Sequence, residues 1–128
     1  MKIILDTNFL IYCAKEKLDY VEEIGEIVNE GYELVVPKQV VNELKKLMAD
    51  GYKRLSVKDK LACDLAIQLL DVNGIKIVEA TGRTVDDAIV NLSKENRKNI
   101  VCTLDREMRH TLGRVILVNK GKKLMLTK

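Results

Sequence analysis

The chain has 128 residues, of which 47% are hydrophobic and 32% are charged, so it can form one domain with a proper core, and extensive disorder is disfavoured. Its formal charge of +3, from 22 basic and 19 acidic residues, is too small to indicate nucleic-acid binding by itself. No run of about 18 apolar residues occurs, which excludes a membrane-spanning helix and favours a cytoplasmic protein.

Short apolar runs alternate with helical periods along the chain. In chain order we expect a strand at residues 3–5, helices at 9–14 and 21–29, a strand at 34–36, helices at 39–48 and 61–70, a strand at 75–78, a helix at 84–94, a strand at 100–104, a short helix at 106–112, a strand at 115–118 and an edge strand at 123–127. This alternation predicts a single domain over residues 1–128 with a three-layer α/β fold, a parallel sheet covered by helices on both faces. The cysteines Cys13, Cys63 and Cys102 are expected to be reduced and mostly buried.

Two aspartates follow predicted strands directly, Asp6 after the first and Asp105 after the fourth. Open parallel sheets bind ligands beyond the carboxyl ends of their strands, so these two side chains could share one crevice. The alternative is that each is an ordinary turn residue or helix cap.

Two further carboxylates lie at the borders of predicted helical stripes. Glu43 borders the apolar face that centres on Leu44, and the alternative role for it is an ion pair with Lys46. Asp86 also lies at a border, whereas Asp87 points toward solvent and completes a capping pattern with Thr84. Asp86 is therefore the better candidate for a site, although both residues suit the positive end of a helix.

Four carboxylates in a confined space raise each other's pKa, so such a cluster requires protons or cations. Oxygen ligands without histidine or cysteine suit Mg²⁺ or Mn²⁺. His110 is the only histidine, which excludes a zinc site of the HExxH type.

Four segments resemble the motifs of PIN-domain nucleases in order and spacing. They are residues 5–11 (LDTNFLI), 37–44 (PKQVVNEL), 85–90 (VDDAIV) and 100–106 (IVCTLDR). The resemblance spans nearly the whole chain. It implies a parallel sheet with an acidic crevice in which Asp6, Glu43, Asp86 and Asp105 form the metal site. It also implies that Asn8 and Thr103 are supporting polar residues.

The double aspartate and residues 17–19 look closest to the branch that includes the small-subunit ribosomal RNA-processing endonuclease, although the long basic extensions of parts of that branch are missing. VapC-type toxins are similar in size and motifs. The resemblance therefore implies an RNA substrate and either an antitoxin or a pre-ribosomal particle as partner. Homodimers are common in the family.

We expect a Mg²⁺- or Mn²⁺-dependent endoribonuclease in which Asp6 and Asp105 hold the principal ion and Asp86 shares that ion or orients its waters. Glu43 takes a second ion or acts as the general base. The candidate phosphate contacts follow two site residues: Arg106, Arg109 and His110 after Asp105, and Lys45 and Lys46 after Glu43. The segment between helices adds Lys53, Arg54, Lys58 and Lys60, although a solvated surface is the alternative for any single lysine.

Three other classes of protein compete with this prediction. A receiver domain would carry an acidic pair after its first strand, whereas Asp6 is followed by Thr7. A haloacid-dehalogenase phosphatase would carry Asp-x-Asp there, and position 8 is Asn. The third is a catalytically inactive PIN-like module that binds RNA or protein, and it is disfavoured because all four acidic positions are filled.

Overall fold

The computed structural model describes residues 1–49 and 55–127, which form an α/β fold around one six-stranded sheet. The strand order is β3-β2-β1-β4-β5-β6. The strands are β1 (Lys2–Leu5), β2 (Glu33–Pro37), β3 (Lys76–Val78), β4 (Ile100–Cys102), β5 (Val115–Val118) and β6 (Leu124–Thr127). The first five are parallel and β6 runs antiparallel to β5, so the expected parallel sheet with an added edge strand is confirmed.

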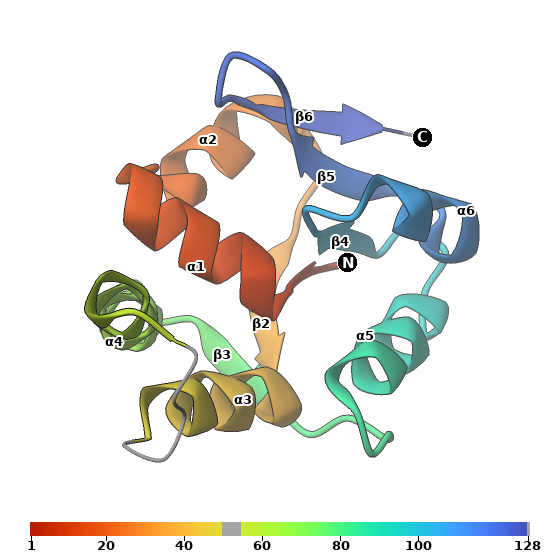
Figure 1. Cartoon of the computed structure of the whole chain (residues 1–128). Coiled ribbons are helices and arrows are strands. Elements are labelled where there is room, and N and C mark those ends of the chain that lie inside the picture. The colour runs from red at the N-terminus through yellow and green to blue at the C-terminus, as the bar shows by residue number, and fades with distance from the viewer. Residues whose placement is uncertain (50–54, 128) are drawn as a thin grey trace.

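Helices cover both faces of the sheet, as predicted. They are α1 (Thr7–Glu16), α2 (Tyr20–Ile27), α3 (Lys38–Met48), α4 (Val57–Val72), α5 (Val85–Lys94) and α6 (Arg109–Leu112), with a 3-10 turn η1 (Arg106–Met108) before α6. In Figure 1, α1, α2 and α4 lie on one side of the sheet, and α5 and α6 lie on the other. Helix α3 contacts α4, α1 and α5, so it joins the two sides near β2 and β3.

The core is formed by the central strands and the helix faces that pack on them. Ile3, Ile4 and Leu5 of β1 are fully buried because the sheet is covered on both faces. On α1, Phe9 is also fully buried and packs edge-on against Tyr20, with 6.1 Å between the ring centres. Complete burial of a side chain of this size contributes about 1.5–3 kcal/mol.

The three cysteines are free and buried, as predicted. Burial raises the pKa of Cys13 to about 12, and it also raises the pKa of the Cys63 and Cys102 thiols. These groups therefore stay protonated near neutral pH, which makes them poor nucleophiles and poor metal ligands.

Element boundaries differ from the prediction where capping, and not apolar periodicity, sets them. Helix α4 begins at Val57, four residues before the expected start, because Ser56 caps it by accepting a hydrogen bond from the backbone N–H of Asp59. Lys58 and Lys60 consequently lie within α4 and not in a segment between helices, whereas Lys53 and Arg54 lie outside the described residues. Strand β4 ends at Cys102, two residues earlier than expected.

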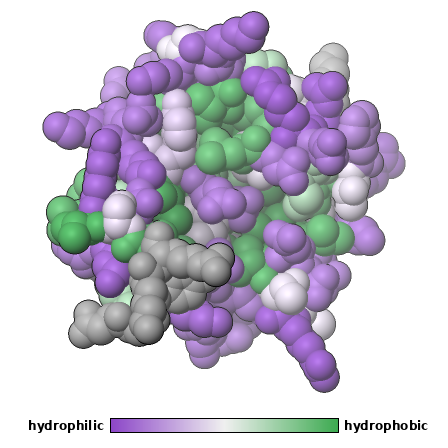
Figure 2. Space-filling model, in the orientation of Figure 1, coloured by the Kyte–Doolittle hydropathy of each residue, from purple (hydrophilic) through white to green (hydrophobic). Residues whose placement is uncertain are grey.

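The visible face of the molecule is mostly hydrophilic, with separate hydrophobic patches (Figure 2). Several large apolar side chains of α4 are exposed, among them Val57, Leu61 and Val72. Within the described ranges no helix has both the length and the apolar character needed to cross a membrane.

Candidate active site

The two strand-end aspartates lie on neighbouring strands. β1 pairs with β4 in parallel, with Leu5 opposite Cys102, so Asp6 and the segment after Cys102 emerge at the same edge of the sheet. The backbone N–H of Asp6 donates to the Cys102 carbonyl at 3.2 Å and fixes this juxtaposition. The predicted crevice is therefore at the carboxyl ends of β1 and β4.

A pocket of about 200 Å³ opens at this edge, and all four predicted carboxylates line it. Asp6 follows β1, Glu43 comes from α3, Asp86 from the first turn of α5, and Asp105 from the segment after β4. The pocket is completed by Thr7, Asn8, Val85, Thr103, Leu104 and Met108. Side chains from four distant segments of the sequence thus meet in one small, polar hollow.

A chain of hydrogen bonds connects the two aspartates through Thr103. The backbone N–H of Asp105 donates to Thr103 Oγ1 at 3.1 Å, and that hydroxyl donates to Asp6 Oδ2, also at 3.1 Å. The other oxygen, Oδ1, accepts the backbone N–H of Thr7 at 2.7 Å, which makes Asp6 the cap of α1. Thr103 is fully buried, so its hydroxyl holds Asp6 in a fixed orientation.

The environment of Asp6 raises its pKa from 3.8 to about 6. Burial makes the largest contribution to this increase. The hydrogen bonds from Thr7 and Thr103 favour the ionised form and therefore lower the pKa, whereas the charges of Asp86 and Glu43 raise it further. The pocket is therefore unfavourable for its own anions unless a proton or a cation is present.

The adjacent aspartates of α5 have separate positions, as the capping pattern predicted. Thr84 Oγ1 accepts the backbone N–H of Asp87 at 3.1 Å, and Asp87 is exposed and does not line the pocket. Asp86 is also exposed but does line it. Within the described residues Glu43 forms no ion pair with Lys46, so the alternative structural role of Glu43 is not seen.

Gln39 connects the helices that carry Glu43 and Asp86, a role that no sequence pattern indicates. Its Nε2 donates to the carbonyls of Ala80 at 2.7 Å and Gly82 at 2.9 Å, in the loop that leads into α5. Gly82 has φ +140°, and a Cβ there would lie 2.8 Å from the backbone nitrogen of Ala88. The loop is therefore pressed closely against α5 and clamped to α3.

Replacement of Gln39 with alanine is expected to lower the free energy of unfolding by about 1–2 kcal/mol, because two carbonyls lose their donor. Amide hydrogen exchange in the first turn of α5 should accelerate in the same variant. The matched control is Gln68→Ala, since Gln68 bonds only the exposed Asp64 on its own helix. Equal effects of the two substitutions would show that the clamp has no special role.

The chemistry of the pocket suits a hard divalent cation, because four carboxylates line it and its lining includes neither histidine nor cysteine. The raised pKa of Asp6 agrees with a site that lacks a balancing positive charge. In their present positions, however, the described side chains form no group of three or more Asp, Glu, His or Cys that could hold an ion. Asp86 is exposed, so a change of rotamer is open to it. Asp105 is exposed as well, but its Oδ1 accepts the backbone N–H of Glu107 at 2.9 Å, which makes Asp105 the cap of η1, as the alternative role for it predicted.

The basic residues predicted to contact phosphates mostly lie outside this pocket. Arg106 is exposed and its Nη2 donates to the Val118 carbonyl at 3.2 Å. Arg109, His110 and Lys45 are exposed as well, and none of these four lines the pocket. Lys46 lines a hollow that adjoins it.

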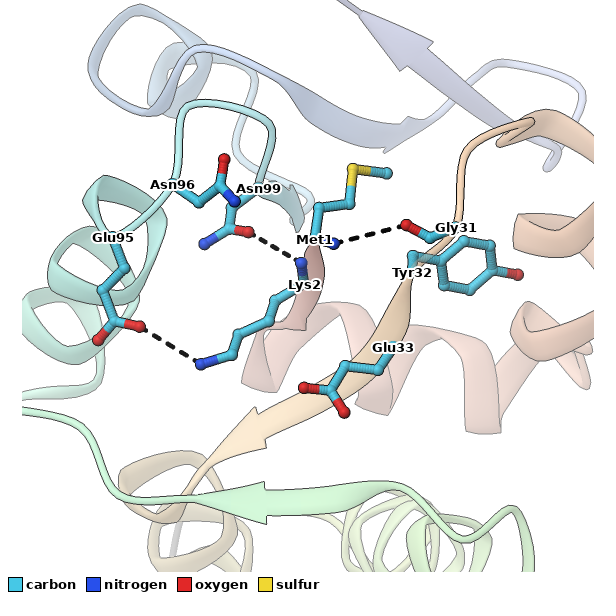
Figure 3. A pocket seen from close by; sticks show the side chains of 8 residues that line it. All are labelled: Met1, Lys2, Gly31, Tyr32, Glu33, Glu95, Asn96 and Asn99. Atoms are coloured by element: carbon cyan, nitrogen blue, oxygen red, sulfur yellow. Dashed lines mark hydrogen bonds and ion pairs between the residues drawn. The ribbon is translucent and has the colours of Figure 1, made fainter.

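A larger hollow, of about 480 Å³, lies at the opposite edge of the sheet (Figure 3). Several of its polar groups are engaged in contacts that join β1 to α5. Lys2 Nζ pairs with Glu95 at 3.3 Å, and the buried Asn99 accepts the backbone N–H of Lys2 at 2.8 Å and donates to the Leu92 carbonyl at 3.0 Å. This hollow therefore has a structural explanation.

Comparison with known proteins places the carboxylate pocket in context. The chain is 39% identical over 111 residues to the protein named Ribonuclease VapC4 of Methanocaldococcus jannaschii, an alignment that covers 87% of this chain and 82% of the relative. Its fold is shared with the PIN domain endonuclease Utp24, with a TM-score of 0.73, 19% identity and coverage of 98% of this chain and 90% of the other. It is also shared with VapBC2 from Rickettsia felis, solved bound to a DNA fragment from their promoter, with a TM-score of 0.59, 12% identity and coverage of 88% and 93%.

Residues 3–119 match the protein family described as "PIN like domain". The match includes all four carboxylates of the pocket and extends from β1 through β5. The resemblance noted in the four sequence motifs and the three-layer fold that it implied are both confirmed. The chain belongs to the PIN-like domain family.

Proposed function

We propose that the protein is a divalent-metal-dependent endoribonuclease that hydrolyses RNA phosphodiester bonds at the carboxylate pocket. The observation that carries this proposal is the meeting of Asp6, Glu43, Asp86 and Asp105 in one hollow at the carboxyl ends of β1 and β4. The name of the 39% identical relative, a ribonuclease, supports the choice of RNA as substrate.

The four carboxylates would hold Mg²⁺ or Mn²⁺, which when bound supplies charge neutralisation at the phosphate and lowers the pKa of a water molecule. The protein's own residues have distinct roles around it. Thr103 fixes the orientation of Asp6 by donating its hydroxyl to Oδ2. Glu43, on a separate helix, is placed to accept a proton from the attacking water as general base or to complete a second cation site. In-line attack by water would leave a 5′-phosphate and a 3′-hydroxyl.

For the biological role we propose a VapC-type toxin with a small antitoxin as partner, supported by the relative that shares 39% identity over most of both chains. Growth arrest on expression, relieved by a small protein encoded beside it, would support this role. The ribosomal RNA-processing role rests on the resemblance of the double aspartate and residues 17–19 to that branch of the family, because the 19% identity to the endonuclease Utp24 bears on the fold alone. Co-sedimentation with pre-ribosomal particles would favour that second role.

Asp86 and Asp87 provide an internal test of the proposed site. Asp86→Asn is expected to reduce cleavage of a single-stranded RNA in Mg²⁺ or Mn²⁺ by about 100-fold, equivalent to about 2.7 kcal/mol. Asp87→Asn should change the rate only a few-fold, because Asp87 is exposed outside the pocket. The two variants lose the same charge from the same helical turn.

Cleavage should also stop in excess chelator and return when the metal ion is restored. Persistence of full activity in chelator, or equal loss in the two variants, would contradict the metal site. Absence of both cleavage and metal-dependent stabilisation in the unmodified protein would support the inactive-module alternative.

A further inference from the structure

The carboxylate pocket continues into two further hollows. On one side it shares Glu43 and Val85 with a hollow of about 330 Å³. On the other it shares Asn8, Leu104 and Asp105 with a hollow of about 380 Å³. Shared lining residues mean that the three hollows adjoin, so together they form one groove that crosses the carboxylates.

The first of these, here called the basic hollow, has unpaired cations at its rim. It is lined by Gln39, Asn42, Glu43, Lys46, Arg83, Thr84 and Val85. Lys46 and Arg83 are exposed and come from different elements, α3 and the loop before α5. Over residues 1–49 and 55–127 neither forms an ion pair. Two free cations beside an acidic pocket suit an anionic group such as a phosphate.

The buried oxygen of Gln39 adds to the polar character of the basic hollow. Gln39 Nε2 is fully used in clamping the loop, but its Oε1 is buried without a hydrogen-bond partner within the described residues. An unsatisfied acceptor in a hollow is a place for a hydroxyl group or a bridging water.

The second, here called the apolar hollow, has a different character. It is lined by Asn8, Ile11, Tyr12, Lys15, Leu104 and Asp105. Leu104 is 38% exposed, and Ile11 and Tyr12 on α1 are half-buried. Among the described residues Lys15 is the one cation of its lining, and it is already paired with Asp59. A ligand at this end therefore meets a tyrosine ring surrounded by aliphatic side chains, and such a surface can pack against a flat base.

We infer that the groove binds single-stranded RNA in an asymmetric manner, with a phosphate held by Lys46 and Arg83 at one end and an unstacked base against Tyr12 and Leu104 at the other. The scissile phosphate lies between them, over the carboxylates. This inference rests on the proposed function for the position of the reaction. A duplex does not fit it, because a base must leave its stack to lie on the tyrosine ring.

The two ends can be tested separately by RNA binding, in an Asp6→Asn background so that no cleavage disturbs the measurement. The probes are an oligouridine and a ribose-phosphate chain of equal length without bases. Lys46→Ala with Arg83→Ala should weaken binding of both probes. The slope of log affinity against log salt should become shallower by about 0.7, the value for one phosphate contact on a single strand, because Lys46 and Arg83 hold the same phosphate.

Tyr12→Ala should weaken binding of oligouridine by about 5- to 150-fold and leave the salt slope unchanged, because base stacking on an aromatic ring is not ionic. It should not affect the chain without bases. Tyr12→Phe retains the ring and should bind oligouridine like the parent. The matched charge control is Lys94→Ala with Arg97→Ala, an exposed lysine at the last residue of α5 and an exposed arginine three residues after it, about 15 Å along the helix from its start.

Several outcomes would overturn the inference: an equal slope change in the charge control, no slope change on loss of Lys46 and Arg83, or equal weakening of both probes by Tyr12→Ala. Failure to bind either probe at all would overturn it too. If binding follows the expected pattern but the protein with Asp6 intact cleaves no RNA, the groove stands and the nuclease proposal fails. If the protein cleaves RNA but does not show the two-ended binding pattern, the nuclease proposal stands and the groove fails.

Discussion

Replacement of Asp6 with asparagine is expected to reduce RNA cleavage by about a thousandfold, equivalent to about 4 kcal/mol, while the fold remains intact. Asp6 is the carboxylate held most firmly in the pocket, by the Thr7 N–H and the Thr103 hydroxyl. Asparagine has the same shape and is an equally good helix cap, so α1 should keep its start. What the substitution removes is a negative charge and a cation ligand.

The control for this substitution is Asp19→Asn. Asp19 also caps a helix, since its Oδ1 accepts the backbone N–H of Glu22 at 3.2 Å at the start of α2, but it does not line the pocket. This variant should cleave RNA at the normal rate. Cleavage rates within a few-fold of normal in the Asp6 variant would remove the basis of the proposed mechanism.

The centre of the sheet was predictable because its strands β1, β4 and β5 are short apolar runs covered on both faces. β1 is such a run, and its residues Ile3, Ile4 and Leu5 are fully buried.

The residues at which helices begin were harder to predict from the sequence, because they depend on caps. The first turn of α4 is largely charged and its cap, Ser56, gives no apolar signal. Periodicity therefore placed the start of α4 one turn too late.

The meeting of the four carboxylates in one pocket was predictable from the geometry of a parallel sheet and of the helices that cover it. Residues that directly follow parallel strands share an edge of the sheet, and carboxylates at the border of a helical stripe lie next to its buried face.

The roles of Gln39, Arg83 and Tyr12 were not predicted from the sequence. Gln39 acts on backbone carbonyls of the loop before α5, and such partners have no signature in the sequence. The position of Arg83 depends on the path of that loop, and that of Tyr12 on how α1 packs beside Leu104.

The contribution of Asp6 to the stability of the metal-free protein is expected to fall as the pH rises from about 4 to about 6. Its pKa is 3.8 as an ordinary aspartate and about 6 in the folded protein. Between these values the native state holds a proton that the unfolded chain has released, so unfolding becomes easier as the pH increases. Above pH 6 both states are ionised, and the loss is complete at roughly 3 kcal/mol.

The contribution of Asp6 is isolated by subtracting the unfolding free energy of the Asp6→Asn variant from that of the normal protein at each pH, with urea as denaturant and a chelator present. Other groups that titrate in both proteins cancel in this difference. The difference should decline between pH 4 and pH 6 and then level off, leaving the asparagine variant relatively more stable at neutral pH. A flat or rising difference would show that burial does not disfavour the Asp6 carboxylate.

Mg²⁺ or Mn²⁺ at neutral pH should reverse this loss in the normal protein, because a cation beside Asp6 favours the ionised form that burial disfavours. The same addition should do much less for the asparagine variant, which has no charge at that position. The instability of the metal-free pocket and its affinity for a cation thus have one physical origin, the burial of the Asp6 carboxylate, with a further contribution from the nearby charges of Asp86 and Glu43. A protein that gained equal stability from the metal ion with and without Asp6 would have to bind that ion elsewhere.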